Sequence, residues 1–548
     1  MTIKKLCKFC NQEFEITDEN FAFYEKIKMP RPAFCPDCRQ RRRASFRNER
    51  NLYKRKCSAS QKDIISMYSP DKVFPVFEQE IWWGDSWDAL KFGRDFDFSR
   101  GFFEQFKELQ NLVPRLSLYN YNSQNSRYTN YSGDNKNCYM GFDLGGCEDV
   151  YHSNWITHSK NCVDCSYTYS SELCYQTIYC EKCYNCDFCQ ECENCMDCSY
   201  LFDCKNCNNC FACAGLRNKR FHILNKPIKE DEYKKFAEQF RGSSERQREA
   251  EKKFQEIRLS VPHKFAVIID SEESSGDYIY HCKNAKNCFD AVRLWDCKYC
   301  YNTLDTKNGY DCYQPGFANS ELIYEVLGGN MFFNSKALFL CKELSNCEYC
   351  DLCYYSENLF GCIGIKRGKF CILNKQYKEN EYHNLKTRVI EHMKTTGEYG
   401  EFFPFNCSPF GYNESKAQEY YSLTRGQALS RNMNWSDYEA PLPTGETIIP
   451  PDDIRQIDDS ILEKIIICEK SSKPFKIIKQ ELDFYKFKRL PIPRKSPQIR
   501  YEERMKLRRP RKLFNRTCAK CNAEIKTTYS PDQPETIYCE ACYLATVY

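Results

Sequence analysis

Small and apolar residues recur at every third position between residues 138 and 213. Sixteen cysteines lie in this stretch, all at residue numbers divisible by three, and the row also contains Gly141, Val150 and Thr168. The positions between them are mostly Asn, Asp, Glu, Lys and Tyr. An α-helix buries residues at a spacing of 3.6 and a flat strand at 2.0. A sustained period of three fits neither.

A twelve-residue repeat lies on top of this period, as in Cys162, Cys174, Cys186, Cys198 and Cys210. Fixed-period self-similarity indicates stacked repeats. Twelve residues per coil, four of them inward, predict a mainly β fold with a narrow, Cys-lined β-solenoid over residues 117–222. The coil geometry resembles that of the beetle antifreeze solenoids. The regular Thr-x-Thr array is missing here, so ice binding is not expected.

The bore of so small a coil has room only for small side chains, and cysteine is small, apolar and commonly buried. A packed core of free thiols is the first interpretation. Metal clusters or disulfides among the same thiols are the alternative, and CxxC spacing does not separate the two because most of the row makes CxxC pairs.

A second solenoid is expected over residues 263–375, after a charged helical linker at 223–262. Its buried row lies at residue numbers divisible by three from Cys282 to Cys312. From there to Cys371 the row continues at every third residue but at shifted numbers, which predicts an insertion near Pro315. The segment FHILNK at 221–226 recurs as FCILNK at 370–375. The two solenoids are therefore interpreted as copies, each followed by a helix.

Residues 1–57 contain two CxxC pairs, Cys7 with Cys10 and Cys35 with Cys38. Two such pairs predict a structural zinc site, closed by four thiolates and without an open position for water. The stretch from CKFC to FCPDCRQRRR resembles the small bacterial zinc-ribbon or treble-clef modules. That resemblance implies a basic helix after the second pair, here over residues 39–56. Residues 58–116 are rich in aromatic residues and are expected to cap the first coil.

The C-terminal end is a second copy of the N-terminal end, since residues 468–548 align with 7–87 without a gap. The copy has lost the first zinc site, where Cys468 stands alone, so residues 468–517 are predicted to be a metal-free module. Residues 518–548 keep a second site and are predicted to be a zinc ribbon. Residues 376–467 are expected to be a helix and an irregular connection. Two Zn²⁺ ions are predicted, and the ligands of the second site are Cys518, Cys521, Cys539 and Cys542.

The composition indicates a cellular compartment and an uneven distribution of charge. The chain has 548 residues and 38 cysteines, which is too long for a small disulfide-stapled secreted module. No signal peptide and no apolar run long enough for a membrane span are visible, so a reducing cytoplasm is expected. The net charge is +5, but residues 39–56 and 486–516 are strongly basic and the remainder is acidic.

Nucleic acid or a ribonucleoprotein is the first partner that this charge pattern suggests, because basic segments beside zinc modules give salt-dependent binding to phosphates. An alternative is that these side chains cover the zinc modules or bind the acidic solenoids. The residues expected to contact RNA or DNA are Arg39, Arg41, Arg42, Arg43, Arg47, Arg50, Lys54, Arg55, Arg500, Arg504, Arg508, Arg509, Arg511 and Lys512.

A protein-interaction or assembly scaffold is the alternative function, with Tyr139, Tyr151 and Tyr175 part of a regular column on the solenoid face. No catalytic constellation is visible: acidic residues are scattered, and none of the seven histidines lies beside a Cys or Asp pair as a triad requires. Storage of many metal ions by the thiol rows is a further alternative. No small-molecule substrate is indicated.

The whole chain resembles an uncharacterised family of Cys-rich zinc-ribbon proteins from small-genome candidate-phylum bacteria. The resemblance depends on FCPDCRQRRR, the repeated Asn-Cys pairs, the ILNK segments and the terminal YCEACY. It implies a bacterial cytoplasmic protein and no particular activity.

Overall fold

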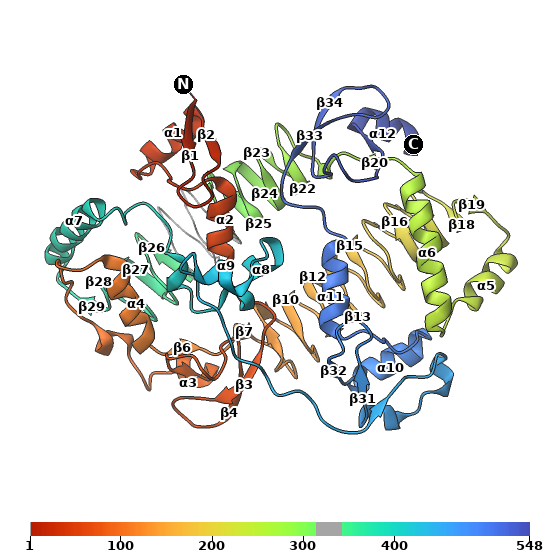
Figure 1. The fold of residues 1–548 in the computed structure, drawn as a ribbon, viewed down its shortest axis with the longest axis horizontal. Coiled ribbons are helices and arrows are strands. Elements are labelled where there is room, and N and C mark those ends of the chain that lie inside the picture. Colours follow the sequence, from red (N-terminus) through yellow and green to blue (C-terminus); the bar gives the residue numbers. More distant parts are fainter. Residues whose placement is uncertain (1, 314–341) are drawn as a thin grey trace.

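The computed structural model describes residues 2–313 and 342–548. The described chain is mostly β, with many small sheets and twelve short α-helices. Two stacks of short parallel strands form the body of the molecule, and both chain ends lie on the same side of it (Figure 1). We call these stacks the first ladder (residues 120–223) and the second ladder (residues 268–313 and 342–372).

The first ladder advances by twelve residues at each step. Ile156 pairs with Thr168, and Thr168 pairs with Cys180, all in parallel. Isolated bridges such as Tyr184 to Met196 keep the same step. Its strands are β7 (Asn120–Tyr121), β8 (Thr129–Asn130), β9 (Ser132–Gly133), β10 (Gly141–Gly145), β11 (Glu148–Tyr151), β12 (Asn154–Thr157), β13 (Lys160–Val163), β14 (Ser166–Tyr169), β15 (Ile178–Glu181), β16 (Ser199–Phe202), β17 (Asn208–Ala214) and β18 (Arg220–Ile223).

Each three-residue step has one inward, one paired and one left-handed residue. In Cys192-Glu193-Asn194 the cysteine is buried, and the Glu193 N–H donates to Cys204 O at 3.1 Å. Asn194 has a φ of 51° and donates its N–H to Glu181 O. Every third residue from Tyr131 to Leu224 has positive φ. A left-handed residue at each third position turns the chain, which is why Asn and Asp are frequent there.

Thiols fill the interior of the first ladder and donate hydrogen bonds to backbone carbonyls. The Cys198 thiol lies 3.1 Å from Met196 O and 3.6 Å from Cys207 O. All described cysteines are free of disulfides. Burial raises the pKa of Cys147 to about 11 and, in the second ladder, that of Cys371 to about 12. These two thiols therefore stay protonated and keep their S–H donors near neutral pH.

The second ladder begins with an eleven-residue step, Ile268 to Ile279, and continues with twelve-residue steps such as Ala291 to Thr303. The phase change predicted near Pro315 lies outside the described residues. The strands of this region are β20 (His263–Lys264), β21 (Ile268–Ile269), β22 (Gly276–Tyr280), β23 (Lys283–Lys286), β24 (Cys288–Lys298), β25 (Tyr301–Lys307), β26 (Lys342–Ser345), β27 (Tyr354–Phe360), β28 (Lys369–Ile372) and β29 (Lys375–Gln376). β19 (Lys226–Pro227) ends the first ladder as β29 ends the second.

The two chain ends have the same order of elements, and β33 begins 461 residues after β3. The N-terminal elements are β1 (Ile3–Leu6), β2 (Glu13–Ile16), α1 (Asp18–Lys26), α2 (Pro36–Ala44), β3 (Tyr53–Lys56), β4 (Asp63–Ser66), β5 (Val76–Phe77) and α3 (Gln79–Trp83). The C-terminal elements, in the same order, are β31 (Ile465–Ile467), β32 (Pro474–Phe475), α10 (Lys479–Lys488), α11 (Pro497–Lys506), β33 (Phe514–Thr517), β34 (Glu524–Thr527), β35 (Ile537–Tyr538) and α12 (Glu540–Val547).

The basic helix expected over residues 39–56 is shorter than the sequence suggested. It ends at Ala44, and residues 53–56 form strand β3. At the end of the helix the Ser45 hydroxyl donates to Arg42 O. Asn48 then holds a turn, because its amide donates to Asn51 O and Met67 O while its carbonyl oxygen accepts the Asn51 N–H. Side-chain bonds of this kind compete with helical backbone bonds.

The remaining elements connect or cover the ladders. The linker after the first ladder contains two helices, and no helix among residues 2–313 and 342–548 is both long and apolar enough to cross a bilayer. These elements are η1 (Ala89–Phe92), α4 (Phe102–Leu112), β6 (Arg115–Leu116), α5 (Glu230–Gln239), α6 (Ser244–Ser260), α7 (Glu379–Thr395), η2 (Phe405–Cys407), η3 (Tyr412–Glu414), α8 (Lys416–Tyr420), α9 (Arg425–Leu429), β30 (Thr447–Ile448), η4 (Ile454–Gln456) and η5 (Asp459–Leu462).

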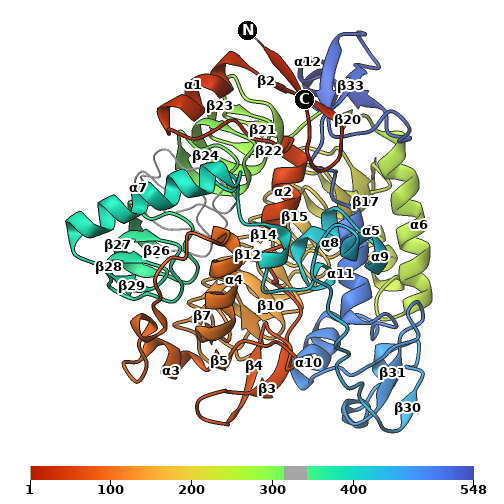
Figure 2. The same cartoon turned by 60° about the vertical axis from the view of Figure 1, so that its left-hand side comes forward.

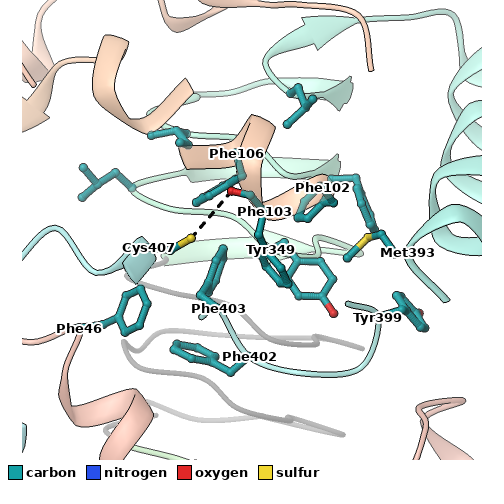
Figure 3. Close-up of a cluster of buried hydrophobic side chains, with 14 of the residues drawn as sticks. Phe46, Phe102, Phe103, Phe106, Tyr349, Met393, Tyr399, Phe402, Phe403 and Cys407 are labelled. Carbon is teal, nitrogen blue, oxygen red and sulfur yellow. Dashed lines mark hydrogen bonds between the residues drawn. The ribbon is translucent and has the colours of Figure 1, made fainter. Parts of the chain in front are cut away.

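Aromatic side chains hold α4 against the second ladder. Phe102 and Phe103 contact Tyr349, and Phe403 packs on Phe106 (Figure 3). The Cys407 thiol donates to Phe103 O at 3.9 Å. The aromatic segment expected to cap the first coil therefore also covers a side of the second ladder.

The ladders touch each other through aromatic and charged side chains. Tyr179 of the first ladder stacks on Tyr278 of the second, with ring centroids 3.7 Å apart. The Tyr278 hydroxyl donates to Glu191 at 2.8 Å, and the Tyr179 hydroxyl donates to Asp290 at 2.9 Å. This contact fixes the two ladders relative to each other. Figure 2 shows α7 beside β26, β27 and β28 of the second ladder.

We expect the left-handed positions to tolerate glycine and reject β-branched residues. Asn194 is exposed and has a φ of 51°, so Asn194→Val should destabilise the first ladder by about 1–2 kcal/mol through backbone strain. Asn194→Gly is the matched control and should change the urea midpoint much less. Equal midpoints for the two variants would contradict the assigned geometry.

Candidate metal centres and arginine clamps

Four cysteines converge at the N-terminal end of the molecule. Cys7 and Cys10 lie on the turn between β1 and β2, and Cys35 and Cys38 lie at the start of α2. Their sulfurs all lie within 4.8 Å of one another, and Cys10 Sγ is 3.8 Å from Cys35 Sγ. A tetrahedral ion with metal–sulfur bonds of about 2.3 Å places its sulfurs about 3.8 Å apart. The group thus has the geometry of a four-thiolate metal site.

A second group of the same form lies at the C-terminal end. Cys518 and Cys521 lie on the turn between β33 and β34, and Cys539 and Cys542 lie at the start of α12. These sulfurs also lie within 4.8 Å of one another, with 3.7 Å between Cys521 and Cys539. Among the described residues these two groups have metal-site geometry, and they are the eight ligands predicted from the sequence.

In each group one thiol has a lowered pKa, whereas the pKa values of Cys10, Cys38 and Cys542 are raised. Hydrogen bonding from the Cys38 thiol lowers the pKa of Cys35 to about 5, although burial opposes it. Burial also opposes ionisation of Cys518, yet the backbone N–H groups of Cys539 and Cys521 bring its pKa down to about 6. Because thiolate is the form that binds metal, each group begins with at least one ligand prepared.

The two groups differ in exposure. Cys7, Cys35 and Cys38 are buried, whereas in the C-terminal group only Cys518 is buried and Cys521 is exposed. Solvent and chelators therefore have a more open approach to the C-terminal sulfurs.

Each metal group has a metal-free counterpart in the other copy. At the N-terminal end Cys57 stands where Cys518 stands in the second copy, and its sulfur accepts the Glu78 N–H at 3.4 Å. At the C-terminal end Cys468 accepts the Ser496 N–H at 3.3 Å, as Cys7 accepts the Cys35 N–H at 3.2 Å. Burial raises the pKa of Cys468, but hydrogen bonds from the Ser471 hydroxyl and from backbone N–H groups outweigh this effect and lower it to about 7. The local backbone survives in both places without three of its four ligands.

The arginines after the first metal group point inward, toward the second ladder. Arg39 Nε lies 2.9 Å from Asp311, and Arg43 lies 3.5 Å from the same carboxylate. All three side chains are buried. Arg39 also donates to Phe34 O at 2.6 Å. We call this arrangement the Asp311 clamp.

The C-terminal copy repeats the arrangement on the first ladder. Arg500 Nε lies 2.7 Å from Asp164 and Arg504 lies 3.0 Å from it, again in full burial. Arg500 also donates to Lys495 O, which corresponds to Phe34. Burial raises the pKa of Asp164, but Arg500 and Arg504 outweigh this effect and hold it below its usual value. We call this arrangement the Asp164 clamp.

Most of the other predicted phosphate contacts also serve contacts within the molecule. Lys54 and Lys512 are exposed. The remaining contacts are Arg41 over Phe9 and Tyr421, Arg42 with Glu401, Arg47 with Glu49 and Asp143, Arg50 over Tyr501, Arg55 with Ser69 O, Arg508 with the Tyr167 hydroxyl, Arg509 with Glu191 and Asp277, and Arg511 with Asp290.

The acidic partners were not singled out from the sequence. Asp164 and Asp311 each occupy a left-handed position directly before a buried cysteine, but so does Asp197, which takes part in neither clamp. One signal in the sequence could have pointed to them. Asp164 and Asp311 are 147 residues apart, and the same separation relates Asp143 to Asp290.

Comparison of the chain with protein-family models and with curated proteins found no match. The two four-cysteine groups are consistent with zinc-ribbon-like modules.

We expect a chelator to empty the two metal groups in order, the exposed C-terminal group first. Metal release measured with a colorimetric indicator should be biphasic. Cys521→Ser should remove the fast phase, and Cys10→Ser, the matched change in the other group, should remove the slow phase. A single phase, or loss of the fast phase in Cys10→Ser, would contradict the difference in exposure.

Neutralising the Asp164 clamp should loosen the first ladder. Removing one partner of a buried ion pair costs about 3–5 kcal/mol, so Asp164→Asn should speed hydrogen exchange of the strands around β13 and β14. Glu172→Gln, on an exposed position of the same ladder, is the control and should leave exchange unchanged. Equal exchange in the two variants would show that the clamp contributes nothing.

The stabilisation contributed by the Asp164 clamp should be lost at acid pH. Because the folded pKa of Asp164 is lowered, its contribution is fully present above the unfolded value of about 3.9 and is lost as the pH falls through the lower folded value. Stability measured between pH 5 and 2 should therefore fall more steeply for the wild-type protein than for Asp164→Asn. Parallel curves would argue against this carboxylate.

Proposed function

We propose that the chain is a non-enzymatic, zinc-binding interaction scaffold. Two narrow β-solenoids form its body, and duplicated zinc modules brace them. The observation that carries the proposal is the use of the basic side chains. Twelve of the fourteen predicted phosphate contacts are engaged inside the molecule, whereas residues 2–313 and 342–548 leave two sides of the first ladder uncovered.

The assignment of zinc rests on the ligand chemistry. Four cysteine sulfurs at the spacing of a tetrahedral thiolate site suit Zn²⁺, and a closed site of this kind is structural rather than catalytic. Reduced thiols throughout the described residues fit a reducing cytoplasm, where such sites persist.

The solenoid assignment rests on the register. A twelve-residue step, constant in the first ladder and present after the first turn of the second, one buried residue in three and a left-handed residue at each corner are what a four-sided coil of three residues per side requires. The domain boundaries predicted at 57/58 and 517/518 are replaced in this proposal by one repeated module at each end, residues 7–87 and 468–548.

The uncovered sides of the first ladder are the proposed partner surface. Lys136, Glu148 and Lys160 form a row of ion pairs there, and Tyr184 and Met196 follow in the same column with exposed fractions of 42% and 46%. A protein partner is the best match for a rigid, mixed surface of charges and exposed Tyr and Met.

The column of Tyr139, Tyr151 and Tyr175, which the sequence predicts as a partner surface, is mostly covered by the C-terminal module. Tyr151 and Tyr175 are buried, and Tyr175 packs on Phe484 and Tyr485 of the C-terminal module. Nucleic-acid binding is the weaker candidate, because the exposed basic residues of the predicted set are Lys54 and Lys512.

The proposal is tested in two steps. Elemental analysis of protein purified under reducing conditions should find about two zinc ions per chain, one for each four-thiolate group. A photo-crosslinking amino acid at Tyr184 should then capture a discrete protein in cells, while the same residue at Ile449, exposed on the connection, should not. Steeply salt-dependent RNA or DNA binding, weakened in a Lys54→Ala, Lys512→Ala variant, would instead favour the nucleic-acid function.

A further inference from the structure

Each end module has two halves that dock in different places. We call residues 3–47 and 465–508 the clamp halves, and residues 53–83 and 514–547 the cap halves. A clamp half carries the first metal position and the arginines of one clamp. A cap half carries the second metal position and a short strand, β5 or β35.

The cap halves pair with the strand that precedes a ladder. β5 pairs in parallel with β6, directly before the first ladder, as Val76 with Arg115. β35 pairs in the same way with β20, directly before the second ladder, as Ile537 with His263. The equivalence extends to side chains: Arg115 donates to the Tyr68 hydroxyl at 3.0 Å, and in the other copy His263 lies 3.1 Å from the Tyr529 hydroxyl.

The clamp halves cross over to the other ladder. The N-terminal clamp half, whose own chain continues into the first ladder, holds Asp311 of the second ladder. The C-terminal clamp half, which follows the second ladder in the chain, holds Asp164 of the first. The clamps and the strand pairs thus join each ladder to the cap half of one module and the clamp half of the other. Some contacts run the other way, since Arg47 also pairs with Asp143 of the first ladder, Arg217 of that ladder donates to the Tyr543 hydroxyl, and Lys366 of the second ladder donates to Trp82 O.

The surviving metal groups are not shared equally between the ladders. The N-terminal module keeps its metal group in the clamp half, and the C-terminal module keeps its group in the cap half. Both of these halves hold the second ladder. The halves that hold the first ladder contain Cys57 and Cys468 in place of a metal group. Figure 1 agrees: the β1–β2 and β33–β34 hairpins flank β22 to β24, and β3–β4 and β31–β32 lie on the opposite side of the molecule.

We propose that the two metal sites act together as a metal-dependent brace on the second ladder, while the first ladder is braced without metal. This inference rests on the metal binding in the proposed function. Metal loss then loosens one half of the molecule selectively, so that metal supply controls the order of the second ladder.

Apolar packing stabilises the two halves that have no metal group. The C-terminal clamp half has a cluster that joins Phe475, Leu482 and Tyr485 to Tyr151 and Tyr175 of the first ladder. The N-terminal cap half packs Tyr68, Phe74 and Val76 with Leu118 and Phe410. These clusters stabilise the two metal-free halves by burying large apolar side chains.

Beside the metal groups themselves the apolar clusters are small. At the N-terminal group the buried cluster is Phe14, Ile16 and three of the four cysteines, and at the C-terminal group it is Ile525, Tyr529 and Ile537. Phe23 and Tyr24 of α1 also pack with Tyr310 of the second ladder, and α1 lies between the two cysteine pairs of its metal group. Since unmetallated small zinc modules lose most of their folding free energy, the position of α1 and of the cysteine turns depends on the ion.

The contacts to the second ladder start at the metal groups. Cys35 and Cys38 begin α2, and Arg39 follows Cys38 directly in the sequence. In the other module Cys539 follows β35 directly, and Thr528 of the same half donates to Asp277 of the second ladder. Disordering either cysteine group therefore displaces a residue that touches the second ladder.

The experiment is pulsed thiol labelling of the full chain, before and after chelation, read by peptide mass spectrometry. Buried thiols react only when their ladder opens, so the rate follows local opening. We expect Cys288, Cys297 and Cys300 of the second ladder to react at least about ten-fold faster after chelation. Cys186, Cys189 and Cys198 of the first ladder should keep their rate and serve as the internal reference for a folded chain. Re-adding Zn²⁺ should restore protection.

Two matched variants locate the effect. Cys38→Ser removes a metal ligand from the N-terminal clamp half and should release the second-ladder thiols without chelator. Cys468→Ser changes the lone cysteine of the other clamp half and should leave them protected. Equal release of both ladders, or of neither, after confirmed metal loss would overturn the brace. A protein that holds no metal as purified fails the proposed function, and that result is separate because metal content is measured first.

Discussion

Each side of a ladder turn is only three residues long, and the rest of the structure depends on this constraint. With one residue inward, one paired and one left-handed, a turn of the ladder encloses mostly small side chains such as Cys, Ser and Thr, with a few larger ones such as Leu144 and Leu201. Small side chains bury little apolar area, so the interior of each ladder contributes less stabilisation per residue than the core of a wider fold. Much of the fold is consequently outside the ladders: aromatic clusters, paired strands and buried ion pairs press on their flanks.

The buried ion pairs show how this external support is organised. Asp164 and Asp311 each receive two arginines from an end module, in full burial. Such pairs add little stability compared with apolar residues of the same size, but they are costly to break and they fix one docking position. The clamps therefore define register between modules and ladders, and the neighbouring aromatic clusters supply most of the favourable free energy.

Local patterns in the sequence were informative, and contacts between distant residues were not. The period of three and the CxxC pairs depend only on neighbours in the chain, and both correspond to observed features: the buried row from Cys138 to Cys213 and the two four-sulfur groups. The arginines were correctly noticed as unusual, but their acceptors lie hundreds of residues away and resemble any other corner aspartate. The sequence does not predict the turn that follows α2, because that turn is held by the bond from Asn48 to Met67 O, a contact that composition does not reveal.

The crossed docking of the two modules also has a consequence for synthesis. Arg500 follows Asp164 by 336 residues, so the first ladder leaves the ribosome long before its clamp exists. At about 5–20 residues per second, this delay is roughly 20–70 s. During that time the flank with Tyr151 and Tyr175 is exposed, beside a row of reduced thiols. The chain therefore passes through a half-braced stage each time it is made, until the segment around Arg500 is translated.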